Sequence, residues 1–465
     1  MVNNFFALTA GLAATASAFD CSGSYFSMFN RKGLSMSAQR LDPALEPGVQ
    51  SAHLHNFDGG NGIALDTTFA SLDASTCTTA RVKADNSLYW RPALYWNGNG
   101  TGFYRVTEQI KMYYKYQDGA GAAEVSEFPE NFQMIAGDQL KRSDDGKNPA
   151  GIRWACHEPQ GTANGNTKDP IFTKGGFPTG FTGCNYGLAS ELTFPSCWNG
   201  EKIDPKNPSA HTAYPNGSGK GTEACPEGFR KARFPTIFIE FWYDIKQFNG
   251  QYKATDNPWV LSNGDSTGFG MHGDFKNGWK KGVLAKAVSP TGGCRCGCGC
   301  GPEELKQCFG ADGINDEKDE NFAKCSAKPL FAGEDNLVVQ KLPGCNPIQA
   351  GPGRAEVKTG PDCASSAPAP GNNNNGGAAS SSAAAPSAPA SSSSKAAAPS
   401  TKPTSTKKDG QMSIQTQNAG NKQPAVSAKA QDANGNVVYV TQTVVSYQTV
   451  AARRHRRHSH RNRMH

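Results

Sequence analysis

Large apolar side chains occupy every second position in two stretches of the chain, and this period of two predicts β-strands. In the first stretch they lie at Ile110, Met112, Tyr114 and Tyr116. In the second stretch, residues 236–245, one face carries only the apolar side chains of Ile237, Ile239, Phe241, Tyr243 and Ile245. Similar runs are separated by clusters of Gly, Asn and Pro, which turns prefer. We therefore expect a mostly β protein, with one short helix near Glu303–Cys308.

Residues 19–363 are enough to bury a large core, and we predict an all-β fold, a β-sandwich of jelly-roll-like type. The aromatic run Tyr89–Trp96 is interpreted as core, although it could instead line a groove. The predicted organisation, in chain order, is a signal peptide (1–18), a β-rich globular domain (19–290), a disulfide-rich C-terminal cap (291–363), a disordered stalk rich in Ala, Ser and Pro (364–436), and a β-prone patch with a basic tail (437–465).

The first 18 residues have the pattern of a secretory signal peptide. An apolar run from Phe5 to Ala14 precedes Ala16-Ser17-Ala18, the small-x-small site that signal peptidase accepts. The run is too short to span a bilayer, which needs about 20 apolar residues, and no later segment qualifies. We expect the mature chain to begin at Phe19 and to be secreted, to the extracellular space or the cell wall.

The chain has 14 cysteines, which on the secretory route predict disulfides. Six are spread along the first part, at Cys21, Cys77, Cys156, Cys184, Cys197 and Cys225. Eight crowd together later, at Cys294, Cys296, Cys298, Cys300, Cys308, Cys325, Cys345 and Cys363. Both groups are even, but the pairing is open. The alternating thiols of residues 294–300 are also typical of a soft-metal loop, and we favour a disulfide-tied cap.

The positive charge lies in the tail. After Cys363 the chain carries six Lys, six Arg and two Asp, a net charge of +10, so the rest carries −3 of the total of +7. A mildly acidic folded part argues against nucleic-acid binding by the globular domain. The Arg and His block at 453–465 predicts contacts with polyanions. Sequons at Asn99 and Asn216 predict glycosylated loops.

Histidines are scarce before the tail and cluster in polar, Gly-rich motifs. One residue separates His53 from His55, and one separates His272 from Asp274, so the two members of each pair would share one face of a strand. We predict one catalytic site from His53, His55, His211, His272, Asp265 and Asp274. Such side chains also suit zinc or copper, and the cofactor is left open. The alternative is that they only satisfy backbone groups of loops around a β-core.

The polar face of residues 236–245 presents an acid, an aromatic ring and an acid, at Glu240, Trp242 and Asp244. A ring that stacks on a sugar, flanked by carboxylates that bind hydroxyls, is what a carbohydrate-binding groove needs. The two acids lie about 13 Å apart along a strand, too far for a glycosidase pair. The alternative is a solvated sheet face with one covering Trp.

Several motifs in one order resemble the fungal secreted family called domain of unknown function nineteen ninety-six. The resemblance covers most of residues 35–290 and rests on Ser51–His55 with Gly59-Gly60, Tyr89–Tyr95, Phe194–Gly200, Ala213–Pro215 with Cys225-Pro226, and Ser262–Asp265 through Gly273–Phe275 to Gly278-Trp279. It implies a fungal source and a cell-wall setting, because family members often sit beside carbohydrate-binding or cell-wall domains. It implies no activity.

The chain departs from the family pattern at two places. Where the family often has Cys-Thr-Thr-Cys, this chain has Cys77-Thr-Thr-Ala80, which implies that one disulfide is rewired. Where the family often has an Asp-His-x-x-His-like stretch, this chain has Asn207–His211, so a metal site that depended on the missing His would be absent.

Three functions remain open from the sequence. The leading hypothesis is a secreted protein that interacts with cell-wall or extracellular polysaccharide. The second is a hydrolase or metal-dependent enzyme that uses the His and Asp cluster. The third is a structural protein of the cell surface, positioned by its stalk.

Overall fold

The computed structural model describes residues 25–118, 121–122, 124–216, 221–289, 294–297, 300–357, 429–431 and 437–439. The chain divides into two compact units, Met1–Gly377 and Ala378–His465, which are described separately. The predicted signal peptide and the basic block at 453–465 lie outside the described residues, as does all of the predicted stalk except its last strand.

A six-stranded antiparallel sheet forms one main layer of the first unit. Its order is β1 (Tyr25–Phe29), β7 (Thr107–Lys115), β17 (Thr236–Asp244), β13 (Gly183–Thr193), β11 (Arg153–Gln160) and β12 (Ile171–Lys174). The two strands expected from the alternation are β7 and β17, and they pair with each other. The apolar sides that predicted them are buried, with Ile110 and Ile239 each 1% exposed.

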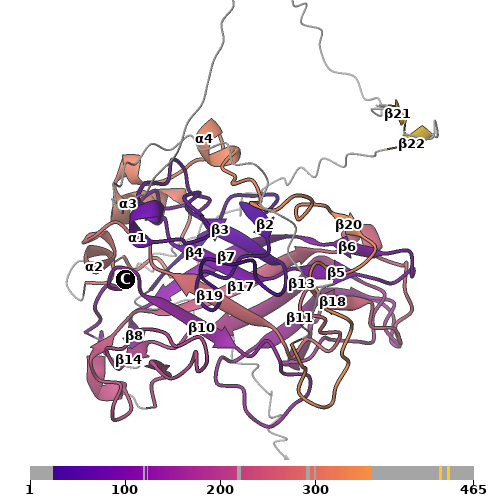
Figure 1. Ribbon diagram of the computed structural model, residues 1–465, viewed down its shortest axis with the longest axis horizontal. Helices are drawn as coiled ribbons and strands as arrows, with labels where there is room; N and C mark the ends of the chain where they lie inside the picture. The colour runs from indigo at the N-terminus through magenta and orange to yellow at the C-terminus, as the bar shows by residue number, and fades with distance from the viewer. Residues whose placement is uncertain are drawn as a thin grey trace, which may run out of the picture. The chain divides into compact units, whose positions relative to one another are not determined.

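A five-stranded antiparallel sheet packs against the first, and Figure 1 shows the two sheets one over the other. Its order is β10 (Gln133–Gly137), β19 (His272–Lys276), β4 (Leu88–Pro92), β3 (His55–Gly59) and β2 (Ser37–Gln39). Tyr89 on β4 and Tyr114 on β7 join the two sheets through their hydroxyl groups, and the Trp279 indole N–H donates to Tyr114 at 2.9 Å. The Tyr89–Trp96 run is buried as core, as the sequence favoured.

Smaller elements complete the unit. One sheet contains β18 (Trp259–Leu261), β5 (Leu94–Trp96), β6 (Phe103–Arg105) and β20 (Val338–Val339), and another contains β15 (Thr212–Ala213), β14 (Cys197–Trp198) and β16 (Ala232–Arg233). A further pair is β8 (Gln117–Asp118) with β9 (Gly121–Ala122). The helices are α1 (Phe69–Asp73), α2 (Val283–Ala287), α3 (Pro302–Phe309) and α4 (Glu320–Ala323), with 3-10 turns η1 (Gly221–Ala224), η2 (Lys246–Phe248) and η3 (Ala311–Gly313). The mostly β prediction is confirmed, and α3 is the expected short helix; the jelly-roll arrangement stays a prediction.

Buried charges lie between the two main sheets and form what we call the charge network: Arg91, Asp58, Glu108 and Asn56. The Arg91 guanidinium lies 2.6 Å from an Asp58 oxygen and 2.8 Å from a Glu108 oxygen. Asn56 Nδ2 donates to the same Glu108 oxygen, and Thr79 donates to Asp58 at 2.9 Å. Every charge in the network therefore has an opposite charge in contact.

Residues 326–357, here called the strap, cross over the sheets after α4. The strap is held to the N-terminal part of the chain, because Leu330 N–H donates to Gln39 at 2.9 Å and Glu334 pairs with Arg40 at 2.9 Å. Further along, β20 pairs with β6, and Ala355 N–H donates to the Leu140 carbonyl at 2.8 Å. The region expected to form a cap is thus threaded across the β-rich domain.

Five disulfides join described cysteines: Cys77–Cys325, Cys156–Cys184, Cys197–Cys225, Cys294–Cys308 and Cys296–Cys300. The prediction of disulfides is confirmed. Cys77–Cys325 joins the two groups that the sequence separated, so the even count of each group did not mean that each pairs within itself.

The described part of the second unit is one antiparallel pair, β21 (Lys429–Gln431) with β22 (Val437–Tyr439). Strand β22 opens the patch for which the sequence predicted β-structure. Within the described residues of both units, no helix is long and apolar enough to cross a bilayer.

Candidate metal centre

Three histidines and one aspartate meet on the outer face of the five-stranded sheet. On β19, Phe275 points to the inter-sheet core, where its ring packs on Tyr89. Because successive side chains of a strand alternate between faces, His272 and Asp274 point to the opposite side. His55 at the start of β3 shares that outer face, and His53 lies in the turn before it. All four are buried, with exposures of 0–4%.

The three imidazole rings are in contact with one another. His53 Nε2 lies 3.2 Å from His272 Nε2. The His55 ring centre lies 4.2 Å from that of His53 and 5.7 Å from that of His272. One nitrogen from each ring lies within 4.8 Å of the others. Such a group of nitrogens matches the first shell of a single ion.

Backbone carbonyls fix the orientation of two rings. His55 Nδ1–H donates to the Leu41 carbonyl at 2.8 Å, and His272 Nδ1–H donates to the Gly270 carbonyl at 2.9 Å. This assignment of the ring protons to Nδ1 leaves the Nε2 lone pairs of both rings directed into the cluster. Metal-binding histidines are held in the same way, with the second nitrogen donating to a carbonyl or carboxylate.

Asp274 supplies a buried carboxylate with no partner. Its side chain is 1% exposed, and neither of its oxygens has a hydrogen bond. Its nearest cationic candidate is His272, whose Nε2 lies 4.0 Å from Oδ2. Burial raises the pKa of Asp274 well above its usual value, and the nearby Asp42 raises it further. A carboxylate in this position is costly unless a positive charge accompanies it.

The rings themselves do not supply that positive charge. Burial lowers the pKa of His53 and of His55 well below 6.5, and the other rings of the cluster lower both further. Burial also lowers the pKa of His272 to about 4. All three are therefore neutral at pH 7, which is the state that binds metal ions.

The spacing of two of the rings fits a tetrahedral ion. Zinc–nitrogen bonds of about 2.05 Å at tetrahedral angles place neighbouring nitrogens about 3.3 Å apart, close to the 3.2 Å between His53 and His272. A hydrogen bond between those two rings would explain that one distance. It would leave His55 Nε2 and both oxygens of Asp274 without partners.

A loop formed by residues 40–52 covers the cluster, and the strap holds this loop down. Arg40 at its start donates from its backbone N–H and its Nε to Glu334 of the strap, at 2.8 and 2.9 Å. At its other end, Asn346 of the strap donates to the Ala52 carbonyl at 2.9 Å. The loop in turn provides the Leu41 carbonyl that orients His55.

Asp265 lies beside the cluster and not in it. Its carboxylate accepts hydrogen bonds from Thr267 and from the Gly270 N–H, at 2.7 and 2.6 Å, and lies 3.7 Å from Arg142. This satisfies the loop, as the alternative interpretation of the sequence held. The same loop presents the Gly270 carbonyl to His272, so Asp265 is a positioning residue for that ring.

His211 belongs to another part of the surface. Its Nε2–H donates to the Gln133 carbonyl at 2.8 Å. Gln133 pairs with Lys276 on β19, whereas Gly137 pairs with His272. Along the sheet, the Gln133 level lies about 13 Å from His272 and about 7 Å from Asp274. His211 contacts the sheet at that level and shares no partner with the other three histidines in the described part of the chain, so the structure brings together four of the six predicted residues.

The predicted carbohydrate-binding residues lie on the outer face of the six-stranded sheet. Trp242 is half-buried, and its indole N–H donates to Glu240 at 3.0 Å. The other Glu240 oxygen accepts from Tyr113 at 2.9 Å, while Asp244 accepts from the Lys246 N–H at 3.2 Å. His157 packs on Trp242 with ring centres 4.7 Å apart, a neighbour that only the β11–β13–β17 pairing reveals.

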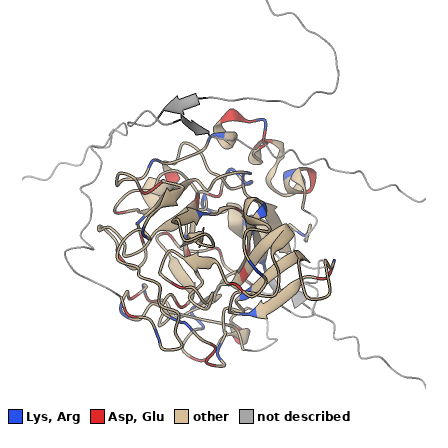
Figure 2. Cartoon of the chain, turned by 90° about the vertical axis from the view of Figure 1, so that its right-hand side faces the viewer, with Lys and Arg blue, Asp and Glu red and all other residues tan. Residues whose placement is uncertain are grey.

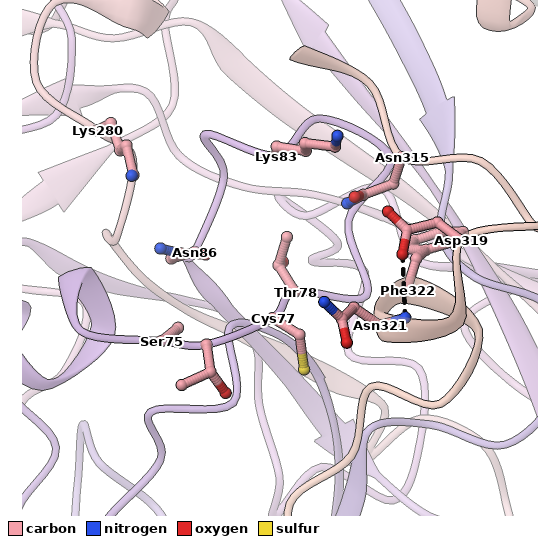
Figure 3. Close-up of a pocket in the computed structure, with 11 residues that line it drawn as sticks. Ser75, Cys77, Thr78, Lys83, Asn86, Lys280, Asn315, Asp319, Asn321 and Phe322 are labelled. Atoms are coloured by element: carbon pink, nitrogen blue, oxygen red, sulfur yellow. Dashed lines mark hydrogen bonds between the residues drawn. The ribbon is translucent and has the colours of Figure 1, made fainter. Parts of the chain in front are cut away.

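Two other candidate sites have weaker support as functional sites. The thiol loop at residues 294–300 contains two disulfides, Cys294–Cys308 and Cys296–Cys300, which removes these four cysteines as thiolate ligands. A polar hollow of about 300 Å³ beside Cys77 is lined by Lys83, Asn86 and Asn315, among others (Figure 3). None of the predicted site residues lines that hollow.

Sequence reasoning missed the residues that surround the metal centre. Asp42 and Arg142 are 5% and 3% exposed and lie close enough to influence the pKa values of Asp274 and His53. Both lie on loops, so no strand period marks them. A buried acid and a buried Arg have no sequence signal beyond their residue type.

A family model described as "Domain of unknown function (DUF1996)" matches residues 42–279, just over half of the chain. The matched range includes all four residues of the metal centre. No curated protein matches the chain, and no solved structure matches it.

Proposed function

We propose, for a chain that belongs to the family Domain of unknown function (DUF1996), that it is a metalloprotein whose ion is held by His53, His55, His272 and Asp274. One observation carries this proposal: a buried carboxylate with no hydrogen-bond partner among the described residues lies beside three neutral imidazoles, with one nitrogen from each ring within 4.8 Å of the others. A divalent ion held by the three imidazoles would neutralise the carboxylate, whose Oδ2 lies 4.0 Å from His272 Nε2. Zinc fits best, since it prefers nitrogen and carboxylate ligands in tetrahedral sites.

The geometry favours a closed, structural centre over a hydrolytic one. Catalytic zinc sites keep one position open for water or substrate, whereas structural sites take all four ligands from the protein. Here the four candidate ligands are at most 4% exposed, under the loop at residues 40–52. The expected role of the ion is therefore to hold that loop and β19 together.

Metal analysis of the purified full-length protein tests the proposal. We expect about one zinc per chain, with the metal lost in His272→Ala and retained in the control His157→Ala, which removes a histidine outside the cluster. Wild-type protein that stays metal-free after incubation with zinc, copper and manganese would assign the orphaned atoms to a buried water instead.

A second candidate function is contact with polysaccharide through the Glu240–Trp242–Asp244 face. It is supported by the partly exposed Trp242 ring, which Glu240 and His157 hold in place. Trp242→Ala should weaken binding to wall glucan or chitin by about 1–3 kcal/mol if the ring is a stacking anchor. Tyr186→Ala, which removes a 71% exposed aromatic of β13, is the control. Equal loss in both variants would contradict a specific role for Trp242.

The secreted, cell-wall setting remains part of this proposal, and the disulfides support it. Lys and Arg are interspersed with Asp and Glu over the first unit (Figure 2), so polyanion binding is assigned to the basic tail. A chain truncated after Ala452 should lose retention on heparin at low salt. Equal retention of the truncated and full-length proteins would exclude the tail as the binding element. A structural surface role would follow if the tail alone bound wall material.

A further inference from the structure

A hollow of about 560 Å³ opens where β10 and β19 end at Gln133 and Lys276. Its walls come from four segments: Pro43–Pro47 of the covering loop, residues 66–68, residues 129–133, and residues 198–211 with Trp198 and His211. The hollow is separate from the metal centre, because Lys276 lies two residues, about 7 Å, beyond Asp274 along the strand. Its volume is that of a site for a small ligand.

Lys276 is the unusual residue of this hollow. Its side chain is nearly buried, with the residue 4% exposed. In the described part of the chain no hydrogen-bond or ion-pair partner of its ammonium group is found, and the carboxylate that attracts it, Asp66, acts from beyond ion-pair distance. The side chain is thus buried along its length, while its unpaired ammonium group lines the hollow.

Gln133 lies directly opposite Lys276 in the β10–β19 register, and its Oε1 is also buried without a partner. A donor and an acceptor that face each other across a strand pair without bonding leave room for a ligand group that binds both. The ligand would bring an anionic oxygen for Lys276 and a hydroxyl for Gln133.

Trp198 provides an apolar wall of fixed orientation. Its indole N–H donates to the Glu201 carbonyl at 2.7 Å. Its ring packs against Phe132 and Phe234, with centres 5.9 Å away in each case. The half-buried ring lines the hollow with the surface that remains, and flat aromatic surfaces of this kind stack on the apolar face of sugar rings.

We propose that this hollow binds a hexuronate unit of an acidic oligosaccharide, with its carboxylate on Lys276, a hydroxyl on Gln133 and its ring on Trp198. Of the charged residues that line the hollow, Lys276 is buried, whereas Lys202, Asp66, Glu130 and Glu201 are exposed. One lysine of this kind matches the single charge of a uronate better than a phosphate, which usually gathers several donors. The site uses neither the metal ion nor the Trp242 face. Its failure would leave both functions proposed above intact.

Calorimetric titration of the full-length protein with trigalacturonate tests the site. The neutral control ligand is trigalacturonate methyl ester, which keeps the rings and removes the charge. We expect at least tenfold tighter binding of the acid. Lys276→Gln should lose at least tenfold, Lys276→Arg should recover part of the affinity, and the exposed control Lys253→Gln should bind as wild type.

Trp198→Ala separates a sugar from a simple anion. It should weaken trigalacturonate while leaving any competition by inorganic phosphate unchanged. The proposal is overturned if acid and ester bind equally, if Lys276→Gln binds as wild type with unchanged near-ultraviolet circular dichroism, or if phosphate competes as strongly as the sugar. No detectable binding of trigalacturonate at millimolar concentration would also overturn it.

Discussion

The charge network and the metal centre are buried to the same degree and share strand β3, which sends alternate side chains to each. Asn56 and Asp58 point inward to Arg91, while His55 points outward to His53 and His272. In the network, each carboxylate touches the guanidinium within 2.8 Å. In the candidate metal centre, the carboxylate of Asp274 has no hydrogen-bond partner among the described residues, and its Oδ2 lies 4.0 Å from His272.

The difference teaches that burial of polar groups does not by itself identify a site. A network whose charges cancel is complete and needs nothing from outside, so its role is to join the two sheets. A cluster whose lone pairs converge without a proton or cation is incomplete. The ion proposed above would complete it, and the atoms left over indicate the charge and coordination of that ion.

The largest effect on stability is expected from breaking the charge network. Arg91→Met leaves Asp58 and Glu108 buried beside each other without a counter-charge. The free energy of unfolding should fall by about 3–5 kcal/mol, measured by urea denaturation. The loss should be the same with and without chelator, because the network contains no ion. A loss below 1 kcal/mol would show that the charges contribute little to the packing of the sheets.

Filling the incomplete cluster should have the next largest effect. Zinc at 100 times its dissociation constant should raise the free energy of unfolding by about 2.7 kcal/mol, because it binds only the folded state. A chelator should reverse the gain, and His55→Ala should abolish it. If zinc stabilises His55→Ala as much as the wild type, the ion binds elsewhere.

Asp274→Asn and Asp58→Asn should change the stability of the protein in opposite directions. In the presence of chelator this variant should be more stable than the wild type by about 1–3 kcal/mol, because it removes a buried carboxylate that has no partner. Asp58→Asn, which removes a paired carboxylate, should be less stable than the wild type. Parallel thermal melts measure both. Destabilisation by both substitutions would mean that Asp274 is partnered in solution.

Asp85 is an intermediate case, with neutral partners only. It accepts hydrogen bonds from Tyr89 and from the Ser87 N–H, and burial raises its pKa to about 7 from 3.8. Since the folded state holds the proton more tightly than the unfolded state, stability falls as pH rises through this range. When the pH is lowered from 8 to 6, the free energy of unfolding of the wild type should rise by about 1 kcal/mol relative to that of Asp85→Asn. A pH-independent difference would contradict the raised pKa.

The strands of the core were predictable because their signal is local. Ile110 and Ile239 lie in runs of strict alternation, and both lie on the inner face of the paired strands β7 and β17. The pairs His53 with His55 and His272 with Asp274 were visible for the same reason. Their meeting required β3 and β19 to flank β4, which no local pattern specifies.

The features that the sequence did not predict depend on strand register and on loops. His211 and His272 contact opposite ends of the β10–β19 pair, and only the register separates them. Cys77 pairs with Cys325 across 248 residues, a connection that counting cysteines does not constrain. Lys276 resembles any surface lysine in the sequence, and its isolation appears only when the walls of the hollow are assembled.

The strap gives the molecule an order of assembly in time. His53 and His272 are 219 residues apart, and at synthesis rates of about 5–20 residues per second the second appears roughly 10–45 s after the first. The covering loop must wait longer still, for Glu334 and Asn346. The first two ligands are thus made as an isolated pair, and the nascent chain cannot close the centre until its C-terminal segment has emerged. If the cluster binds a metal ion as proposed, the ion is therefore loaded late in the maturation of this protein.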